Sequence, residues 1–316
     1  MKNQLIAAIH WQSINNLAKI YHAYLPLPQQ NNTMKAFLGM GLLGSNFVQA
    51  MQSKGIAVQV WNRTAGKAKA LEQYGAKAFE SITDAVSNAE TIHITLKDDG
   101  TVDEVLGHAE AALLPGATII DHTTTSVKGA VERTAAWKAK GFTYLHAPVF
   151  MGPQNALEGS GYMLVSGDQK GIAKHQAELS AMTGKLINFG TEEGKAAAMK
   201  LLGNLFLLTL TAGISDTLAL AKVYDISPDN LLELFDSWNP GASMPARLKR
   251  IATGQFEQPS WELNMARKDA GLMIAAADEG GGHLAIIPSI AEQMDKWIAK
   301  GYGANDWSVI AKDNLP

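Results

Sequence analysis

One lysine and one asparagine stand out in the longest apolar stretch of the chain. Residues 194–223 read GKAAAMKLLGNLFLLTLTAGISDTLALAKV, and Lys200 is the only charged residue between Lys195 and Asp216. In a helix, Asn204 lies one turn beyond Lys200, so the ammonium and the amide project from the same face. In a cleft, desolvation would tune the pKa of such a lysine for general acid–base catalysis. The alternative is a core helix whose lysine extends its ammonium to a nearby surface.

A glycine-rich stretch begins at Met34 and reads MKAFLGMGLLGSNFVQAMQSKG. The pattern predicts a short strand, a turn with three glycines, and a helix that ends at Gly55. Gly39 allows the tight turn, Gly41 lets a pyrophosphate approach backbone N–H groups, and Gly44 lets the helix pack closely on the strand. We therefore expect a dinucleotide-binding loop made of Gly39, Met40, Gly41, Leu42, Leu43 and Gly44.

The residues after the second expected strand, AVQVW, bear on the choice of cofactor. NAD-binding folds place an acidic residue there to hold the ribose 2′-hydroxyl, but no acidic residue occurs between Gly44 and Glu72. Arg63 offers a planar donor to a 2′-phosphate, with Asn62 and Thr64 beside it. The sequence therefore favours NADP over NAD, although Arg63 could also be an ordinary surface arginine.

The elements that position these residues follow from the alternation of apolar strands and helices. Strands are expected at 91–96, 117–120 and 142–149, with helices over 65–74, 101–113 and 128–140, and two more strands in GYMLVSG and KLINFG to complete the sheet. This alternation predicts a Rossmann-type, doubly wound parallel sheet of the α/β class. Its ligands should lie at the carboxyl ends of the strands, where Leu96, Lys97, Thr123, Thr124 and His146 fall. His93 lies within a strand and is expected to be a packed core histidine.

Three segments are expected along the chain. Residues 1–33 contain no acidic residue and end in LPLPQQNNT, which is typical of a flexible extension. Residues 34–191 should form the nucleotide-binding domain. Residues 192–316 should form an all-helical C-terminal domain for substrate binding and dimerisation, because residues 194–316 read as helix with interruptions at 238–240, 257–260 and 279–283.

Composition narrows the possible functions. The chain has 316 residues, a net charge of −3 and a pI near 6.2, so no nucleic-acid or membrane partner is expected. It has no cysteine, which excludes disulfides and fits a cytoplasmic protein, and its eight histidines lack metal-site spacing, so no metal is expected. The uncharged run at 201–215 is shorter than the roughly 20 residues of a membrane helix, which favours a buried helix.

Five separated motifs together resemble a known family. They are GMGLLG at 39–44, DHTTTS at 121–126, HAPVFMGPQNALEG at 146–159, GKAAAMKLLGN at 194–204 and RKDAGLM at 267–273. In order and spacing, the chain from Met34 onward resembles the β-hydroxyacid dehydrogenases of the 6-phosphogluconate dehydrogenase superfamily, which include 3-hydroxyisobutyrate dehydrogenase and glyoxylate and succinic semialdehyde reductases.

The resemblance implies a role for several residues. Lys200 takes the place of the family's general acid/base and Asn204 that of its partner asparagine. Thr123 takes the place of the hydroxyl residue near the substrate carboxylate, and Thr124 would lie near the cofactor. Lys268 resembles the residue that closes over the nicotinamide end. The resemblance also implies a homodimer or homotetramer.

One motif departs from the family pattern. Members that bind a hydroxyacid usually show DAPVSGG, whereas this chain has Phe150, Met151 and Gly152 in place of the serine and the paired glycines. The change removes a hydroxyl and makes the expected substrate site more apolar, which favours a bulkier or less acidic substrate than a small hydroxyacid.

We therefore expect an NADP(H)-dependent enzyme that acts on CH–OH, interconverting a hydroxyacid or related alcohol and its semialdehyde or keto form by hydride transfer, with Lys200 as general acid/base. Two alternatives remain open: an NADPH-dependent imine reductase, because WNRT and the altered motif resemble imine reductases of the same superfamily, or an NADPH-binding protein of low turnover.

Overall fold

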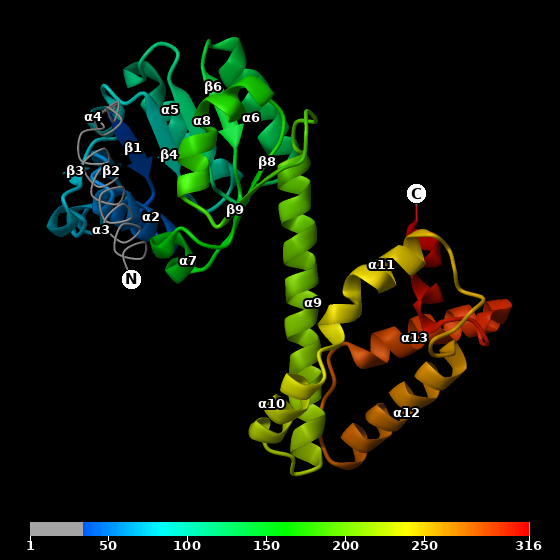
Figure 1. Ribbon diagram of the computed structural model, residues 1–316. Helices are drawn as coiled ribbons and strands as arrows, with labels where there is room; N and C mark the ends of the chain where they lie inside the picture. The colour runs from blue at the N-terminus through cyan, green and yellow to red at the C-terminus, as the bar shows by residue number, and fades with distance from the viewer. Residues whose placement is uncertain (1–33, 316) are drawn as a thin grey trace, which may run out of the picture. The chain divides into compact units, whose positions relative to one another are not determined.

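The computed structural model describes residues 34–315, which form two compact units (Figure 1). The first unit ends at Leu202 and the second begins at Gly203, so the division falls within the long helix α9 (Lys195–Val223). The expected flexible extension at 1–33 lies outside the described residues.

A six-stranded parallel sheet is the centre of the first unit. Its strands run in the order β3-β2-β1-β4-β5-β6. Their bounds are β1 (Lys35–Leu38), β2 (Val58–Trp61), β3 (Lys77–Phe79), β4 (Thr91–Ile94), β5 (Thr118–Asp121) and β6 (Thr143–His146). This sheet and the helices between its strands confirm the predicted Rossmann-type architecture.

Alternation along β1 explains why the sheet is covered on both faces. Phe37 belongs to one buried apolar cluster, whereas Ala36 and Leu38 belong to another, because successive side chains of a strand point to opposite faces. All three are fully buried. Burial of a side chain such as Phe37 stabilises the fold by roughly 1.5–3 kcal/mol.

The helices of the first unit connect these strands. They are α2 (Leu42–Ser53), α3 (Ala65–Lys69), α4 (Ile82–Val86), α5 (Asp99–Ala109), α6 (Val127–Ala139), α7 (Pro153–Glu158) and α8 (Gln169–Ala181), with short 3₁₀ turns at η1 (Glu72–Tyr74) and η2 (Glu110–Ala112). The sequence prediction did not include the short elements β3 and α4, whose lengths of three and five residues carry little periodic signal.

The expectation that GYMLVSG and KLINFG complete the main sheet is wrong. Their strands, β8 (Tyr162–Val165) and β9 (Lys185–Asn188), form a separate three-stranded sheet with β7 (Val149–Phe150). The expected strand at 142–149 is divided between β6 and β7. After β6 the chain leaves the main sheet, and β7 pairs antiparallel with β8 instead.

The second unit is helical within the described residues. Beyond the C-terminal part of α9 it contains α10 (Pro228–Ser237), α11 (Met244–Ala252), α12 (Leu263–Glu279), α13 (Ile287–Trp297), the 3₁₀ turn η3 (Pro240–Ser243), the π-helical turn η4 (Ile298–Tyr302) and the 3₁₀ segment η5 (Trp307–Asn314). Asp216 of α9 anchors the start of α13 to α9. Its carboxylate accepts hydrogen bonds from the backbone N–H groups of Ala285, Ile286 and Ile287.

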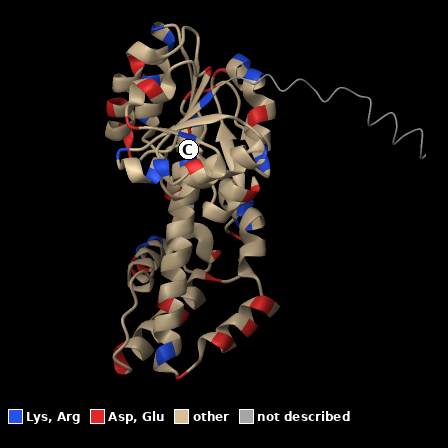
Figure 2. Cartoon of the chain, turned by 90° about the vertical axis from the view of Figure 1, so that its left-hand side faces the viewer, with Lys and Arg blue, Asp and Glu red and all other residues tan. Residues whose placement is uncertain are grey.

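The expectation of a buried α9 is wrong for the single chain. Its apolar residues are largely exposed, including Leu205 at 63% and Leu208 at 71%, and Figure 2 shows most of the helix without charge. Among the described helices, α9 is the one whose length and composition would allow it to cross a membrane. A soluble protein whose helix is covered by another chain has the same composition, so this match is weak evidence for a membrane.

Candidate functional site

A cleft of about 490 Å³ lies at the carboxyl ends of the parallel strands of the first unit. It is formed by the loop before α2, the segments after β4 and β5, the segment from β7 to α7, and the start of α9. Its lining residues are Gly41, Leu42, Leu43, Thr95, Leu96, Lys97, His122, Thr123, Thr124, Val149, Met151, Pro153 and Lys200. Most of the predicted site residues of the first unit therefore meet in one place.

The glycine loop has the backbone geometry that a dinucleotide requires. Gly39 has φ +100°, and a side chain there would collide with the Thr95 carbonyl. At Gly44 a side chain would collide with the Gly39 carbonyl, so α2 can pack this closely only on a glycine. Gly41 faces open space, and no side chain within residues 34–315 caps the N-terminus of α2. The exposed N–H groups and the helix dipole fit the pyrophosphate of a nicotinamide dinucleotide.

The two residues after β2 differ in role: Asn62 supports the glycine loop, and Arg63 is an exposed cation. Asn62 accepts a hydrogen bond from the Met40 N–H through Oδ1, at 2.9 Å, and donates to the Thr64 carbonyl, so it supports the glycine loop. Arg63 is exposed and forms an ion pair of 2.8 Å with Glu104 of α5. A 2′-phosphate would have to share or displace this carboxylate.

Thr123 is held from two sides. Its hydroxyl accepts a hydrogen bond from the Leu96 N–H at 3.0 Å, which joins the segments after β4 and β5. Its own N–H donates to Asp121 Oδ1 at 2.8 Å. Because the hydroxyl oxygen already accepts from Leu96, its hydrogen can be directed toward an oxygen in the cleft.

Lys200 is a buried lysine at the edge of the cleft. It is 8% exposed, and its Nζ lies 4.2 Å from the centre of the Phe150 ring. Burial lowers the pKa of the ammonium from 10.5 to about 8. The lysine therefore exchanges a proton near neutral pH, as a general acid/base must.

Phe150 and Met151 place apolar atoms beside this lysine. Phe150 presents the face of its ring to the ammonium, which is a cation–π contact, and Met151 lines the cleft. Gly152 precedes α7, and its N–H donates to Asn155 Oδ1 at 2.9 Å. Of these three predicted substrate residues, Met151 lines the cleft directly, Phe150 contacts it through Lys200, and Gly152 supports the turn.

Three expected residues lie elsewhere. Lys268 belongs to α12 in the second unit, where its Nζ lies 3.0 Å from Asp269 Oδ1. Asn204 lies on α9 one helical turn after Lys200, just beyond the division between the units. His146 does not line the cleft, because its Nε2 donates to the Thr123 carbonyl at 2.9 Å and so supports the loop after β5.

Sequence reasoning did not single out several residues that line or support the cleft. Thr95 donates its hydroxyl proton to the Gly39 carbonyl at 2.8 Å. His122 donates from Nδ1 to the Ala147 carbonyl at 2.9 Å and lies 3.0 Å from the buried His93. Burial and the neighbouring His93 lower the pKa of His122 to about 3, so this histidine is not an acid catalyst at neutral pH. Of these residues, Thr95 could have been predicted as a site residue from the sequence, because it lies at the end of an expected strand.

Comparison with known proteins places the chain in a family. Residues 35–190 match the profile of the NAD-binding domain of 6-phosphogluconate dehydrogenase, and residues 194–313 match the NAD-binding profile of NADP-dependent 3-hydroxyisobutyrate dehydrogenase. The chain is 25% identical to the uncharacterized oxidoreductase YfjR of Bacillus subtilis, over 88% of this chain and 98% of YfjR. It is also 25% identical to glyoxylate/succinic semialdehyde reductase 1 of Arabidopsis thaliana, over 87% of this chain and 96% of the reductase.

Two further comparisons extend this result. The chain is 30% identical to human cytokine-like nuclear factor N-PAC over 87% of its own length, but it spans 50% of N-PAC. In fold it is similar to an imine reductase from Myxococcus stipitatus in complex with NADP⁺, with a TM-score of 0.83 and 21% identity over 88% of this chain and 99% of that one. With the two profiles covering the described residues almost completely, the chain belongs to the β-hydroxyacid dehydrogenase family of NAD(P)-dependent oxidoreductases.

Proposed function

We propose that this protein is an NADP(H)-dependent oxidoreductase that interconverts a hydroxyacid, or a related alcohol, and its semialdehyde or keto form. The observation that carries the proposal is the placement of Lys200, a buried lysine with a pKa of about 8, in the same cleft as the glycine loop. The activity named for the Arabidopsis reductase, on glyoxylate and succinic semialdehyde, supports this substrate class.

The residues of the cleft divide the chemistry between them. The nicotinamide cofactor, when bound, supplies or accepts the hydride. In reduction, Lys200 donates a proton from Nζ to the substrate oxygen as it becomes a hydroxyl, and in oxidation the neutral amine takes that proton back. The Thr123 hydroxyl orients the oxygen. Phe150 excludes water from the ammonium, so the proton is delivered to the substrate.

NADP is the preferred cofactor in this proposal. The end of β2 carries Arg63, with no carboxylate in the loop to hold a ribose 2′-hydroxyl. The part of the glycine loop that lines the cleft, Gly41 to Leu43, would contact the remainder of the cofactor together with Thr124, Leu96 and Lys97.

Imine reduction is the second candidate, and one observation favours it. Phe150 and Met151 stand where hydroxyacid-binding relatives have a hydroxyl and a glycine, so the cleft has less to offer a carboxylate. Lys200 favours carbonyl chemistry instead. A third candidate is an NADPH-binding protein of low turnover, since N-PAC is described as a nuclear factor and matches over half its length.

One experiment separates these functions. The purified protein is assayed for NADPH oxidation with a panel of semialdehydes, keto acids and cyclic imines, with NADH controls, and NADPH affinity is measured by fluorescence. Turnover of a semialdehyde or keto acid faster than of every imine supports the proposal. Faster turnover of an imine would favour the second candidate, and tight NADPH binding without turnover would favour the third.

The exposed apolar side chains of α9 lead us to propose a homodimer or homotetramer in which a second copy covers this helix. Side chains such as Leu205, Phe206 and Leu208 form a patch that a monomeric soluble protein rarely exposes. We also propose a cytoplasmic location. Sedimentation of the purified protein and fractionation of cells test these two statements.

A further inference from the structure

A closed ring of hydrogen bonds surrounds the loop that carries Thr123. On one side, Arg133 of α6 donates from Nε to the Tyr144 hydroxyl at 3.1 Å, and this hydroxyl donates to Asp121 Oδ2 at 2.5 Å. Asp121 Oδ1 in turn accepts the Thr123 N–H at 2.8 Å.

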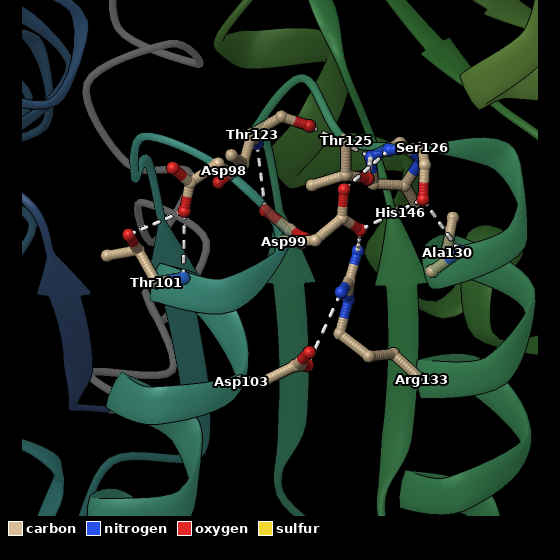
Figure 3. Close-up of polar contacts among 12 residues, drawn as sticks. Asp98, Asp99, Thr101, Asp103, Thr123, Thr125, Ser126, Ala130, Arg133 and His146 are labelled. Atoms are coloured by element: carbon tan, nitrogen blue, oxygen red, sulfur yellow. Dashed lines mark hydrogen bonds and ion pairs between the residues drawn. The ribbon is translucent and has the colours of Figure 1, made fainter.

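The ring closes on the other side through Asp99, the first residue of α5. Arg133 donates from Nη2 to Asp99 Oδ1 at 2.6 Å, and Asp99 Oδ2 accepts the Ser126 N–H at 2.9 Å (Figure 3). Thr123 and Ser126 are joined by the backbone between them. The Ser126 end of this loop is therefore linked to the guanidinium through Asp99, and the Thr123 end through Asp121 and the Tyr144 hydroxyl.

Burial makes this arrangement rigid and costly to break. Arg133 is 5% exposed and Asp121 is fully buried. Burial alone would lower the pKa of Arg133, but Tyr144 and Asp99 outweigh it and raise the pKa, so the guanidinium stays charged. Loss of that charge would leave the Asp99 carboxylate without the cation of its ion pair and the buried Asp121 carboxylate without the positive charge beyond Tyr144.

The start of α6 is shaped to admit the Asp99 carboxylate. The Ser126 side chain accepts the Gly129 N–H at 2.9 Å and caps the helix. A side chain at Gly129 would collide with Asp99 Oδ1. The close approach of Asp99 to this helix therefore depends on a glycine within its first turn.

We propose that Arg133 is a positioning residue that holds the Thr123 hydroxyl in place for the reaction. The ring holds the Thr123 backbone through its N–H, and the Leu96 N–H donates to its hydroxyl oxygen. Arg133 does not line the cleft, so it acts through Asp121, Asp99 and Thr123 and not on the substrate itself. This inference rests on the proposed function, which places Thr123 beside the reacting oxygen.

The test is a double-mutant cycle between Arg133→Met and Thr123→Val. If Arg133 acts through Thr123, Arg133→Met lowers kcat about tenfold or more in the native protein but less than about twofold in the Thr123→Val background. NADPH affinity should fall by a smaller factor than kcat, because the glycine loop lies outside the ring and only Thr124 of the proposed cofactor contacts lies in the loop that the ring holds. A general loss of structure would lower kcat by the same factor in both backgrounds and would overturn the proposal.

Lys140→Met is the matched control. Lys140, just after α6, pairs with Glu110 at 2.7 Å and so links the far ends of α5 and α6 without touching the loop. This variant should keep kcat. If it lowers kcat as much as Arg133→Met does, any link between these helices matters equally, and the specific role of Arg133 is refuted.

Hydrogen exchange gives a readout that needs no substrate. The Thr123 and Ser126 amides should exchange at least about tenfold faster in Arg133→Met than in Lys140→Met, because their carboxylate acceptors lose their anchor. Tyr144→Phe, which removes one hydroxyl, should speed exchange at Thr123 more than at Ser126, and it replaces Arg133→Met if that variant does not fold. Unchanged exchange of the Thr123 and Ser126 amides in Arg133→Met would overturn the positioning role of Arg133. A native protein that shows no turnover would overturn only the proposed function.

Discussion

Replacing Lys200 by methionine tests the acid–base role most directly. Methionine keeps an unbranched apolar stem but carries no proton. Because Lys200 is 8% exposed and Phe150 covers its ammonium, water has little access to act in its place. General acid catalysis contributes about 10²–10⁴-fold, so we expect kcat for reduction to fall by roughly 10³-fold. The Kd for NADPH should change by less than about threefold, since the glycine loop is intact.

The pH dependence of the native enzyme follows from the same lysine. Burial sets the pKa of Lys200 at about 8, so at pH 7 the protonated form exceeds the neutral one by roughly ten to one. Reduction requires the protonated form, so its kcat should be constant below about pH 7 and fall above about pH 8. Oxidation requires the neutral amine, so its kcat should rise over the same interval.

Steady-state rates between pH 6 and 10, in both directions, measure this dependence. Lys200→Arg is the matched variant, because arginine keeps the charge but does not lose its proton in this range. Its slow reduction should show no decline near pH 8. The acid–base role is refuted if Lys200→Met retains more than about a tenth of native kcat, or if the native profile is flat in both directions.

Three further predictions concern the cofactor and the assembly. Arg63→Ala should raise KM for NADPH about tenfold and leave KM for NADH within about twofold, whereas Glu104→Gln, which frees Arg63 of its ion pair, should lower KM for NADPH about two- to threefold. Gly44→Ala should weaken NADPH binding at least about tenfold and lower Tm by several degrees, because its methyl group collides with the Gly39 carbonyl; fluorescence titration and thermal unfolding measure both. Leu208→Glu should convert the assembly to monomers in analytical ultracentrifugation, because it places a charge in the apolar face of α9.

Each of these predictions has a control and a contrary outcome. Gly66→Ala adds a methyl group in open space and should leave NADPH binding and Tm unchanged. Leu157→Glu changes an exposed leucine of α7 and should leave the assembly intact. Equal effects of Arg63→Ala on both cofactors would contradict the 2′-phosphate role, and a native protein that is monomeric at micromolar concentration would contradict the assembly.

Local sequence patterns were sufficient for the glycine loop and for every strand of the main sheet except β3. Strands such as β1 and β4 are short segments rich in apolar residues and separated by helices, and the spacing of Gly39, Gly41 and Gly44 encodes a turn directly. The same patterns could not divide the strands between two sheets. Whether β8 pairs with the main sheet or with β7 depends on contacts between residues far apart in the chain.

The sequence did not predict the residues that hold the cleft residues in place, for the same reason. Arg133, Tyr144 and Glu104 are ordinary residues of a helix or strand when read in sequence. Their significance comes from partners that are 11 to 41 positions away, such as Asp99 for Arg133 and Arg63 for Glu104. No short motif records such pairs.

The sequence by itself determined the fold class, the dinucleotide loop and the identity of the lysine, because each depends on residue types at short spacing. Only the tertiary structure decided that the Lys200 ammonium lies against the Phe150 ring in the same cleft as Thr123 and that burial brings its pKa to about 8. It also decided that α9 exposes its apolar face in the single chain. A pKa and an exposed surface depend on what surrounds a side chain, and the folded chain alone supplies those surroundings.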